Sequence, residues 1–261
     1  MGEHLSHDVA VVTGAGRGIG RAIALCLAAE GAAVAVCART EAEIDETAAL
    51  ISDAGGRAVP LRLDVKDANG VRQVIGQVAK QFGPVTIVVN NAGTPGPAGL
   101  DWEVDAEAWF ECIEVIVRGA LLLCQAVVPS MIARGSGRII NVASVSGTRA
   151  FPPIIATSVA KTALIRFSEG LAGQLADHGV RVFAIHPGVV RTRLLESYGL
   201  QVPEEWFVGP ERAGDLCARL ATGRYDALSG RFLSIDDDLE SLLSRTADIA
   251  TRELYTLRIQ T

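Results

Sequence analysis

Short apolar runs alternate with longer amphipathic stretches along most of the chain. The apolar runs are rich in Val, Ile and Ala, which is typical of strands that are buried on both faces of a parallel sheet. We predict seven strands: Val9–Val12, Val34–Cys37, Ala58–Leu63, Val85–Val89, Arg138–Val142, Val180–Ile185 and Arg231–Ile235. The stretches between them predict helices over Ile19–Ala29, Glu41–Ala54, Val71–Phe82, Asp105–Ala133, Thr157–Asp177 and Pro210–Ala221. This alternation predicts an α/β protein, a doubly wound seven-stranded parallel sheet with helices on both faces.

Two segments depart from this alternation. The region near residues 190–209 is irregular and contains aromatic residues, which indicates a mobile flap. The C-terminal extension, near residues 236–261, begins with three acidic residues and then places apolar residues at helical spacing. This spacing predicts a helix docked on the rest of the protein, and a partner-binding helix is the alternative. Because no linker-like stretch divides the chain, we expect residues 1–261 to form a single domain.

Composition and charge exclude several classes of protein. Hydrophobic residues make up 49% of the 261 positions, which is enough for a sizeable core. Acidic residues outnumber basic ones, 30 to 24, which argues against binding to nucleic acid or to a membrane surface. We expect no run near the ~18 apolar residues of a membrane span, and residues 1–8 lack the apolar core of a signal peptide. We therefore expect a cytoplasmic protein.

The cysteines give no sign of a metal site or of disulfides. Their number is odd, no two form a C-x-x-C pair, and all lie in apolar surroundings: Cys26, Cys37, Cys112, Cys124 and Cys217. We interpret them as small buried hydrophobic residues in a reducing compartment.

A glycine-rich segment joins the first predicted strand to the first predicted helix. Its residues are Thr13, Gly14, Ala15, Gly16, Arg17, Gly18, Ile19 and Gly20. Glycines allow a sharp turn and a close approach to a pyrophosphate, and a helix N-terminus offers unpaired N–H groups and the positive end of a dipole. The strand–turn–helix context predicts a dinucleotide site. The alternative is a turn that only packs the helix against the strand.

The spacing T-G-x-x-x-G-x-G resembles that of the short-chain dehydrogenase/reductase family, and further motifs extend the resemblance from residue 9 to about residue 235. These motifs are Asp64 and Val65 after the third strand, Asn91, Ala92 and Gly93 after the fourth, Ser144 after the fifth, and Pro187, Gly188, Val190 and Thr192 after the sixth. The resemblance implies a Rossmann fold with strand order 3-2-1-4-5-6-7. It also implies a nicotinamide cofactor held by these residues and Lys161, a small-molecule substrate, and a homo-oligomer (dimer or tetramer).

The end of the second strand favours NADP(H) over NAD(H). An acidic residue there would bind a ribose 2′-hydroxyl and repel a 2′-phosphate, but Ala38 stands in that place. Arg39 and Arg17 could both reach a 2′-phosphate, because a guanidinium binds phosphate through two parallel hydrogen bonds. The alternative is that both arginines are solvated surface residues.

The catalytic set implied by the resemblance is incomplete. The family uses a Ser, a Tyr and a Lys, with the Tyr four residues before the Lys so that both project from one helix face. Ser144 and Lys161 match, but Thr157 occupies the Tyr position. An Asn that joins a proton relay in the family is replaced by Ile116. Because a Thr hydroxyl is far less acidic than a phenol, the proton must come from another donor.

Several other groups could supply this proton. Tyr198 lies on the flap, His186 precedes the Pro-Gly segment, and water or an acidic hydroxyl of the substrate are further alternatives. Three arginines, Arg149, Arg191 and Arg193, lie on segments that we expect to border the pocket. They hint at an anionic or polyphenolic substrate, although solvated arginines are the default interpretation.

Three hypotheses about function follow from these observations. The first is an NADP(H)-dependent oxidoreductase that interconverts a carbonyl and an alcohol on a small substrate with an altered proton donor. The second is a non-redox enzyme on the same scaffold, such as a dehydratase, cyclase or isomerase, which the loss of the Tyr and the Asn favours. The third is a catalytically silent cofactor-binding subunit. Resemblance of fold alone does not separate them.

Overall fold

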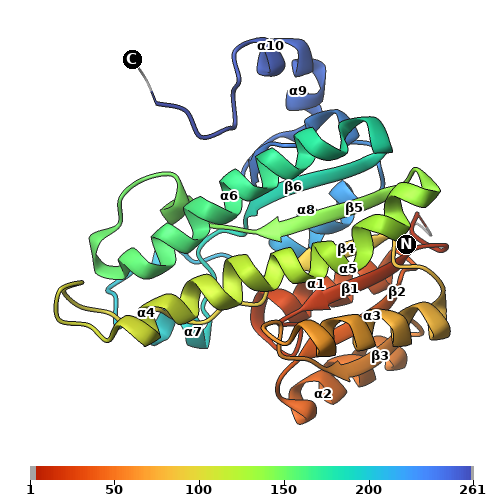
Figure 1. Ribbon diagram of the computed structural model, residues 1–261, viewed down its shortest axis with the longest axis horizontal. Helices are drawn as coiled ribbons and strands as arrows, with labels where there is room; N and C mark the ends of the chain where they lie inside the picture. Colours follow the sequence, from red (N-terminus) through yellow and green to blue (C-terminus); the bar gives the residue numbers. More distant parts are fainter. Residues whose placement is uncertain (1–3, 260–261) are drawn as a thin grey trace.

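The computed structural model describes residues 4–259 and contains a seven-stranded sheet in which every neighbouring pair is parallel (Figure 1). The strand order is β3-β2-β1-β4-β5-β6-β7, as predicted. The strands are β1 (Val9–Thr13), β2 (Ala33–Ala38), β3 (Arg57–Arg62), β4 (Ile87–Asn90), β5 (Gly137–Val142), β6 (Val180–His186) and β7 (Phe232–Ser234). Five of the first six strands are buried along most of their length, which explains their largely apolar sequences.

Helices cover both faces of the sheet. They are α1 (Gly18–Ala29), α2 (Glu41–Asp53), α3 (Ala68–Phe82), α4 (Ala106–Ile113), α5 (Gly119–Arg134), α6 (Ile155–Leu175), α7 (Arg193–Glu196), α8 (Glu211–Ala221), α9 (Leu239–Ser244) and α10 (Thr246–Thr251). One apolar core lies between the sheet and α1, α2, α8, α9 and α10. A second core lies between the opposite face and α3, α5 and α6, which lie in front of the sheet in Figure 1.

The long helix predicted over Asp105–Ala133 has a defect in its middle. A π-helical turn, Glu114–Arg118, separates α4 from α5. The whole stretch, Ala106–Arg134, is the one helix in the described part of the chain that is long and apolar enough to cross a membrane, contrary to our expectation from sequence. Its α5 portion packs Leu123, Val127 and Met131 into the second core, as in the core helix of a soluble protein.

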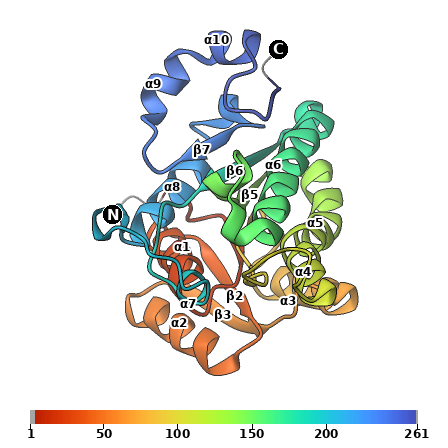
Figure 2. The same cartoon turned by 90° about the vertical axis from the view of Figure 1, so that its left-hand side faces the viewer.

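The two irregular segments acquire local structure. The expected flap contains the short helix α7 and a 3-10 turn (Glu204–Trp206), and Val189 pairs with Phe207 across its base. The C-terminal extension forms two short helices in place of the single helix that we predicted. These helices lie beyond the sheet edge formed by β7 (Figure 2). They pack on the first core through Leu239, Leu242 and Ile249.

The carboxyl ends of the parallel strands meet on the side of the molecule that faces the viewer in Figure 2. The segments that follow β1, β4, β5 and β6 contain almost all the residues singled out from the sequence. In open parallel sheets this edge is where ligands bind, because helix N-termini and strand-end loops converge there.

Candidate functional site

The glycine-rich segment forms a tight turn between β1 and α1. Gly14 (φ 63°) and Gly18 (φ 55°) adopt the left-handed backbone region that favours glycine. A Cβ atom on Gly20 would lie 2.2 Å from the Gly14 carbonyl oxygen, so no larger residue fits there without moving the turn. Within the described residues no side chain caps the N-terminus of α1. Its first N–H groups are therefore available to a pyrophosphate, which fits the dinucleotide expected from the sequence.

Asn91 ties the segment after β4 to this turn. Its side-chain amide donates hydrogen bonds to the carbonyl oxygens of Thr13 (2.9 Å) and Gly14 (3.2 Å). The Thr13 hydroxyl oxygen accepts from the backbone N–H groups of Asn91 and Ala92, each at 3.1 Å. Gly93 follows directly, and a Cβ atom there would lie 3.7 Å from Leu194 of α7. These contacts bring four predicted cofactor residues into one rigid unit.

The residues expected to bind the adenosine half lie beyond β2 and β3. Asp64 accepts a hydrogen bond from the Lys66 N–H at 3.0 Å, which fixes the turn after β3. Val65 is buried and packs against Gly119 at the start of α5. Arg39 follows β2 and its side chain is exposed.

Glu43 of α2 is a neighbour of this region that sequence reasoning missed. Its carboxylate accepts from Arg17 at 2.9 Å and from Arg193 at 3.0 Å. Glu43 therefore links the glycine-rich turn to the start of α7. The sequence offered no signal for this contact, because Glu43 and Arg193 are 150 residues apart.

The Pro-Gly segment after β6 packs closely on its surroundings. Gly188 has a φ of 80°, and a Cβ atom there would lie 2.4 Å from Ile235. Val190 is buried, while Thr192 caps α7 by accepting from the Leu195 N–H at 3.2 Å. The Thr192 methyl group lies 3.3 Å from the Cβ position of Gly18, so this segment reaches the glycine-rich turn.

Ser144 and Lys161 approach the same strand end. The Lys161 ammonium donates a hydrogen bond to the Val142 carbonyl oxygen at 2.5 Å, two residues before Ser144. The Ser144 hydroxyl oxygen accepts from the N–H and the hydroxyl of Ser146, both at 3.1 Å. Both contacts use the Ser144 oxygen as an acceptor, which leaves its own O–H free to donate to a ligand.

The environment of Lys161 changes its acid–base behaviour. Burial of the ammonium lowers the pKa of Lys161 to about 8, because desolvation disfavours the charged form. A ligand that restores hydrogen bonds to the ammonium would raise this pKa again.

Thr157 makes a contact that the sequence suggested only as one of several alternatives. Its hydroxyl oxygen lies 2.6 Å from the phenol oxygen of Tyr198, and both residues are buried, with 6% and 7% of their surface exposed. Burial raises the pKa of Tyr198, and the hydrogen bond with Thr157 lowers it by a smaller amount. The phenol is therefore protonated at neutral pH.

Two residues on the α4 side complete the surroundings of Thr157. The Cys112 thiol lies 3.6 Å from the Thr157 hydroxyl, and burial raises the pKa of this thiol. Cys112 is buried, as expected, but it borders the site, which we did not predict. Ile116 is buried in the apolar cluster that also contains Cys112, so an apolar side chain stands where the family's relay has an Asn.

Three of the remaining candidates already have partners within the protein. His186 accepts from the Val145 N–H through Nδ1 at 3.4 Å, and burial lowers its pKa. Arg191 pairs with Glu204 at 2.7 Å and stacks on Phe207, while Arg193 pairs with Glu43. These ion pairs brace the flap, which removes the sequence argument that these two arginines await an anionic substrate.

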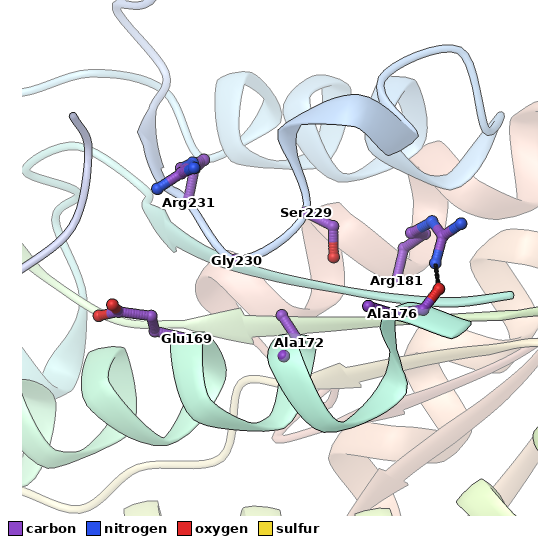
Figure 3. A pocket seen from close by; sticks show the side chains of 8 residues that line it. Glu169, Ala172, Ala176, Arg181, Ser229, Gly230 and Arg231 are labelled. Atoms are coloured by element: carbon purple, nitrogen blue, oxygen red, sulfur yellow. Dashed lines mark hydrogen bonds between the residues drawn. The ribbon is translucent and has the colours of Figure 1, made fainter. Parts of the chain in front are cut away.

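Two hollows lie outside the contacts described so far. One, of about 380 Å³, lies between α6 and the turn before β7 and is lined by Glu169, Arg181 and Arg231 (Figure 3). Arg181 opens β6, so this hollow is at the amino end of the strands. The other, of about 760 Å³, lies between the segment after β5, the outer face of α6 and residues 257–259, and Arg149 is among the residues that line it. Neither contains Lys161 or Thr157.

Comparison with known proteins agrees with the geometry. The family model described as short chain dehydrogenase matches residues 8–202. A short chain dehydrogenase of Pseudocercospora fijiensis is 40% identical over 192 residues, 73% of this chain, and the match spans 62% of that protein's length. The cis-4-hydroxycyclohexanecarboxylate dehydrogenase of Sinomonas cyclohexanicum is 34% identical, with 90% of this chain and 98% of that protein covered.

A solved structure gives the same result. A crystal structure of an actinorhodin polyketide ketoreductase with NADPH superimposes with a TM-score of 0.82 at 31% sequence identity. It covers 90% of this chain and 97% of the ketoreductase chain.

Proposed function

Because the chain belongs to the short-chain dehydrogenase/reductase family, we propose that it is an NADP(H)-dependent oxidoreductase that interconverts a carbonyl and an alcohol on a small organic substrate. The observation that carries this proposal is the contact of Lys161 with the strand end beside Ser144, at the same sheet edge as the glycine-rich turn. A reactive carbonyl bound between these groups would have both a hydride source and polar partners for its oxygen.

The cofactor would be held by groups from four strand ends. The free N–H groups of α1, with Gly14, Gly16 and Gly18, suit the pyrophosphate. Lys161 suits the ribose next to the nicotinamide, and Pro187 to Thr192 would brace the nicotinamide ring. When bound, the reduced nicotinamide supplies a hydride to the carbonyl carbon.

This chain's own residues would act on the carbonyl oxygen. The free O–H of Ser144 can donate to it, and a charged Lys161 favours the negative charge that develops there during hydride transfer. Thr157 is not the proton donor in this proposal, because an aliphatic alcohol is too weak an acid to replace a phenol. The donor is therefore another group.

NADP(H) is favoured over NAD(H) by the end of β2. Ala38 leaves room beside the adenosine ribose, and the exposed Arg39 supplies positive charge for a 2′-phosphate. Arg17 is less suited than we expected from the sequence, because it already pairs with Glu43. A related structure holds NADPH, which supports the same choice.

Transfer of a labelled hydride tests the proposed function. The protein is incubated with NADPH carrying deuterium at both C4 positions and a panel of ketones, including cyclohexanones and a bicyclic ketone. Deuterium in an alcohol product is the expected result. Tight NADPH binding without deuterium transfer to any ketone would favour the non-redox alternative, which the burial of Ile116 in an apolar cluster supports.

We further propose that the protein is a cytoplasmic homo-oligomer. The helices α4, α5 and α6 expose large apolar side chains to solvent, among them Phe110 (60% exposed), Leu121 (40%) and Val159 (41%). Such a surface suits a second copy of the chain. All five cysteines are free thiols, which suits a reducing compartment. Light scattering during size-exclusion chromatography would measure the oligomeric state.

A further inference from the structure

A tyrosine from the flap places its hydroxyl beside Thr157, the residue of α6 that stands at the family's tyrosine position. Thr157 lies in the first turn of α6, and Lys161 lies one turn further along the same helix. The Tyr198 phenol oxygen is 2.6 Å from the Thr157 hydroxyl oxygen. The two residues are 41 positions apart, so the contact depends on how the segment after β6 folds back.

Local structure holds Tyr198 in this position. Thr192 caps α7, and the Tyr198 N–H continues the turn by donating to the Leu195 carbonyl at 3.2 Å. Gly199 follows with a φ of 62°, which lets the chain reverse immediately after the tyrosine. Only 7% of the Tyr198 surface is exposed, so the side chain is packed inside the protein.

The contacts around Thr157 allow a hydrogen bond from its hydroxyl to the phenol. The Gly96 N–H donates to the Thr157 hydroxyl oxygen at 3.4 Å. Either oxygen can be the donor in the Thr157–Tyr198 bond, and in one of the two directions the Thr157 O–H donates to the Tyr198 oxygen. A hydrogen bond in that direction leaves the phenol proton available to a ligand, and it stabilises the phenolate that forms when the proton leaves.

We propose that Tyr198 is the proton donor of the carbonyl reduction, and that Thr157 is a positioning residue that holds the phenol oxygen. This inference rests on the proposed function. In the reductive direction, the carbonyl carbon gains a hydride with its electron pair from the reduced nicotinamide, which is oxidised. The O–H bond of Tyr198 breaks, the carbonyl oxygen takes the proton, and the phenolate takes a proton back from water. The reverse steps apply to oxidation of the alcohol.

The test compares the parent protein with Tyr198→Phe on a ketone that the deuterium experiment identifies. Loss of a positioned general acid costs ~10²–10⁴ in rate, so we expect kcat to fall by about that factor. The dissociation constant for NADPH, measured by its fluorescence, should stay within about twofold, because the phenol does not hold the cofactor. Deuterium transfer by the parent protein is the separate readout of the proposed function, so the two failures are distinguishable.

Tyr225→Phe is a matched control. Tyr225 is also buried, and its hydroxyl donates to Glu240 at 2.6 Å on the opposite side of the sheet. This variant loses the same atom from a similar environment, and its kcat should match that of the parent. If the two variants unfold at similar temperatures, a loss of kcat in Tyr198→Phe alone is not due to a folding defect.

Variants of Thr157 separate positioning from chemistry. Thr157→Val removes one hydrogen bond to the phenol, worth about 1 kcal/mol, so kcat should fall by about tenfold or less. It should also move the alkaline limb of the pH–rate profile upward, because the bond from Thr157 lowers the pKa of Tyr198. Thr157→Ser keeps the hydroxyl and should restore both properties.

Two results would overturn the proposal. A kcat for Tyr198→Phe equal to that of the parent would show that the phenol donates no proton. A higher kcat would show that Tyr198 only obstructs the substrate site.

Discussion

Lys161 donates its ammonium hydrogen bond to Val142, a residue of the sheet, across 2.5 Å. One carbonyl oxygen is a poor substitute for water around a positive charge, and the pKa of Lys161 falls to about 8 as a result. In the ligand-free protein, the charged Lys161 ammonium therefore lowers the free energy of unfolding. A cofactor that supplies further hydrogen bonds to this ammonium would remove the cost.

Replacing Lys161 should stabilise the ligand-free protein. Below pH 8 the folded protein must hold a charged, poorly solvated ammonium, and a shift from 10.5 to about 8 corresponds to up to about 3 kcal/mol. We expect Lys161→Met to raise the free energy of unfolding at pH 7, measured by urea denaturation, while NADPH binding and turnover are lost.

The pH dependence of this effect has a definite sign. The unfolded chain binds more protons at this lysine between pH 8 and pH 10.5, so the parent's stability rises relative to the variant over this range. The higher free energy of unfolding of Lys161→Met, relative to the parent, should therefore disappear toward pH 10.5. Lys80→Met, at an exposed lysine on α3, should show no such trend.

Arg39 should decide between the two nicotinamide cofactors. NADPH should bind at least several-fold more tightly than NADH, because Ala38 leaves room and Arg39 supplies charge for the 2′-phosphate. Arg39→Asp should reverse this order in fluorescence titrations. Arg72→Asp, the same change of charge on the exposed side of α3, should leave the order unchanged. Equal affinities in the parent would remove the argument.

Two glycine substitutions should act in opposite directions. In Gly20→Ala the new methyl group would meet the Gly14 carbonyl at 2.2 Å, so the turn must open. We expect lower stability and weaker NADPH binding. Gly76 lies on the exposed side of α3 with no atom within 4 Å of its Cβ position. Gly76→Ala should stabilise the protein by about 0.5–1 kcal/mol without changing the affinity for NADPH.

Introducing a tyrosine at position 157 of α6 should destabilise the protein unless Tyr198 of the flap is made smaller. In Thr157→Tyr the new ring would compete with Tyr198 for one buried space, and overpacking costs about 1–3 kcal/mol. Combining Thr157→Tyr with Tyr198→Ala should recover stability in urea denaturation. A single variant as stable as the parent would contradict this interpretation of the contact.

The sequence was sufficient for the fold because the information was local. Buried strands such as β1 and β2 can be recognised by their continuous apolar residues. The glycine-rich turn indicates where the first helix begins. The π-helical turn at Glu114–Arg118 was missed because its sequence continues the same apolar helical pattern without Pro or Gly. The break between α9 and α10 was missed for a similar reason.

Only the site residues that belong to sequence motifs could be predicted. Lys161 and Ser144 were found from their spacing, but the bond between Thr157 and Tyr198 joins the start of α6 to the segment after α7, which no local pattern connects. Cys112 was interpreted as a hydrophobic residue, which its burial supports. That it lies beside Thr157 depends on how α4 packs on α6, which the sequence does not encode locally.

The C-terminal segment forms a hydrogen bond with the outer edge of β7, the last strand of the sheet. The Phe232 N–H, on the side of β7 that faces away from β6, donates to the Tyr255 carbonyl at 2.9 Å, and Tyr255 takes a φ of 60°. During synthesis, about twenty more residues must therefore leave the ribosome before the outer side of this edge strand is paired. Until then an unpaired strand edge is open to association with other chains. In the folded protein the segment after α10 occupies this edge, while α9 and α10 pack on the first core.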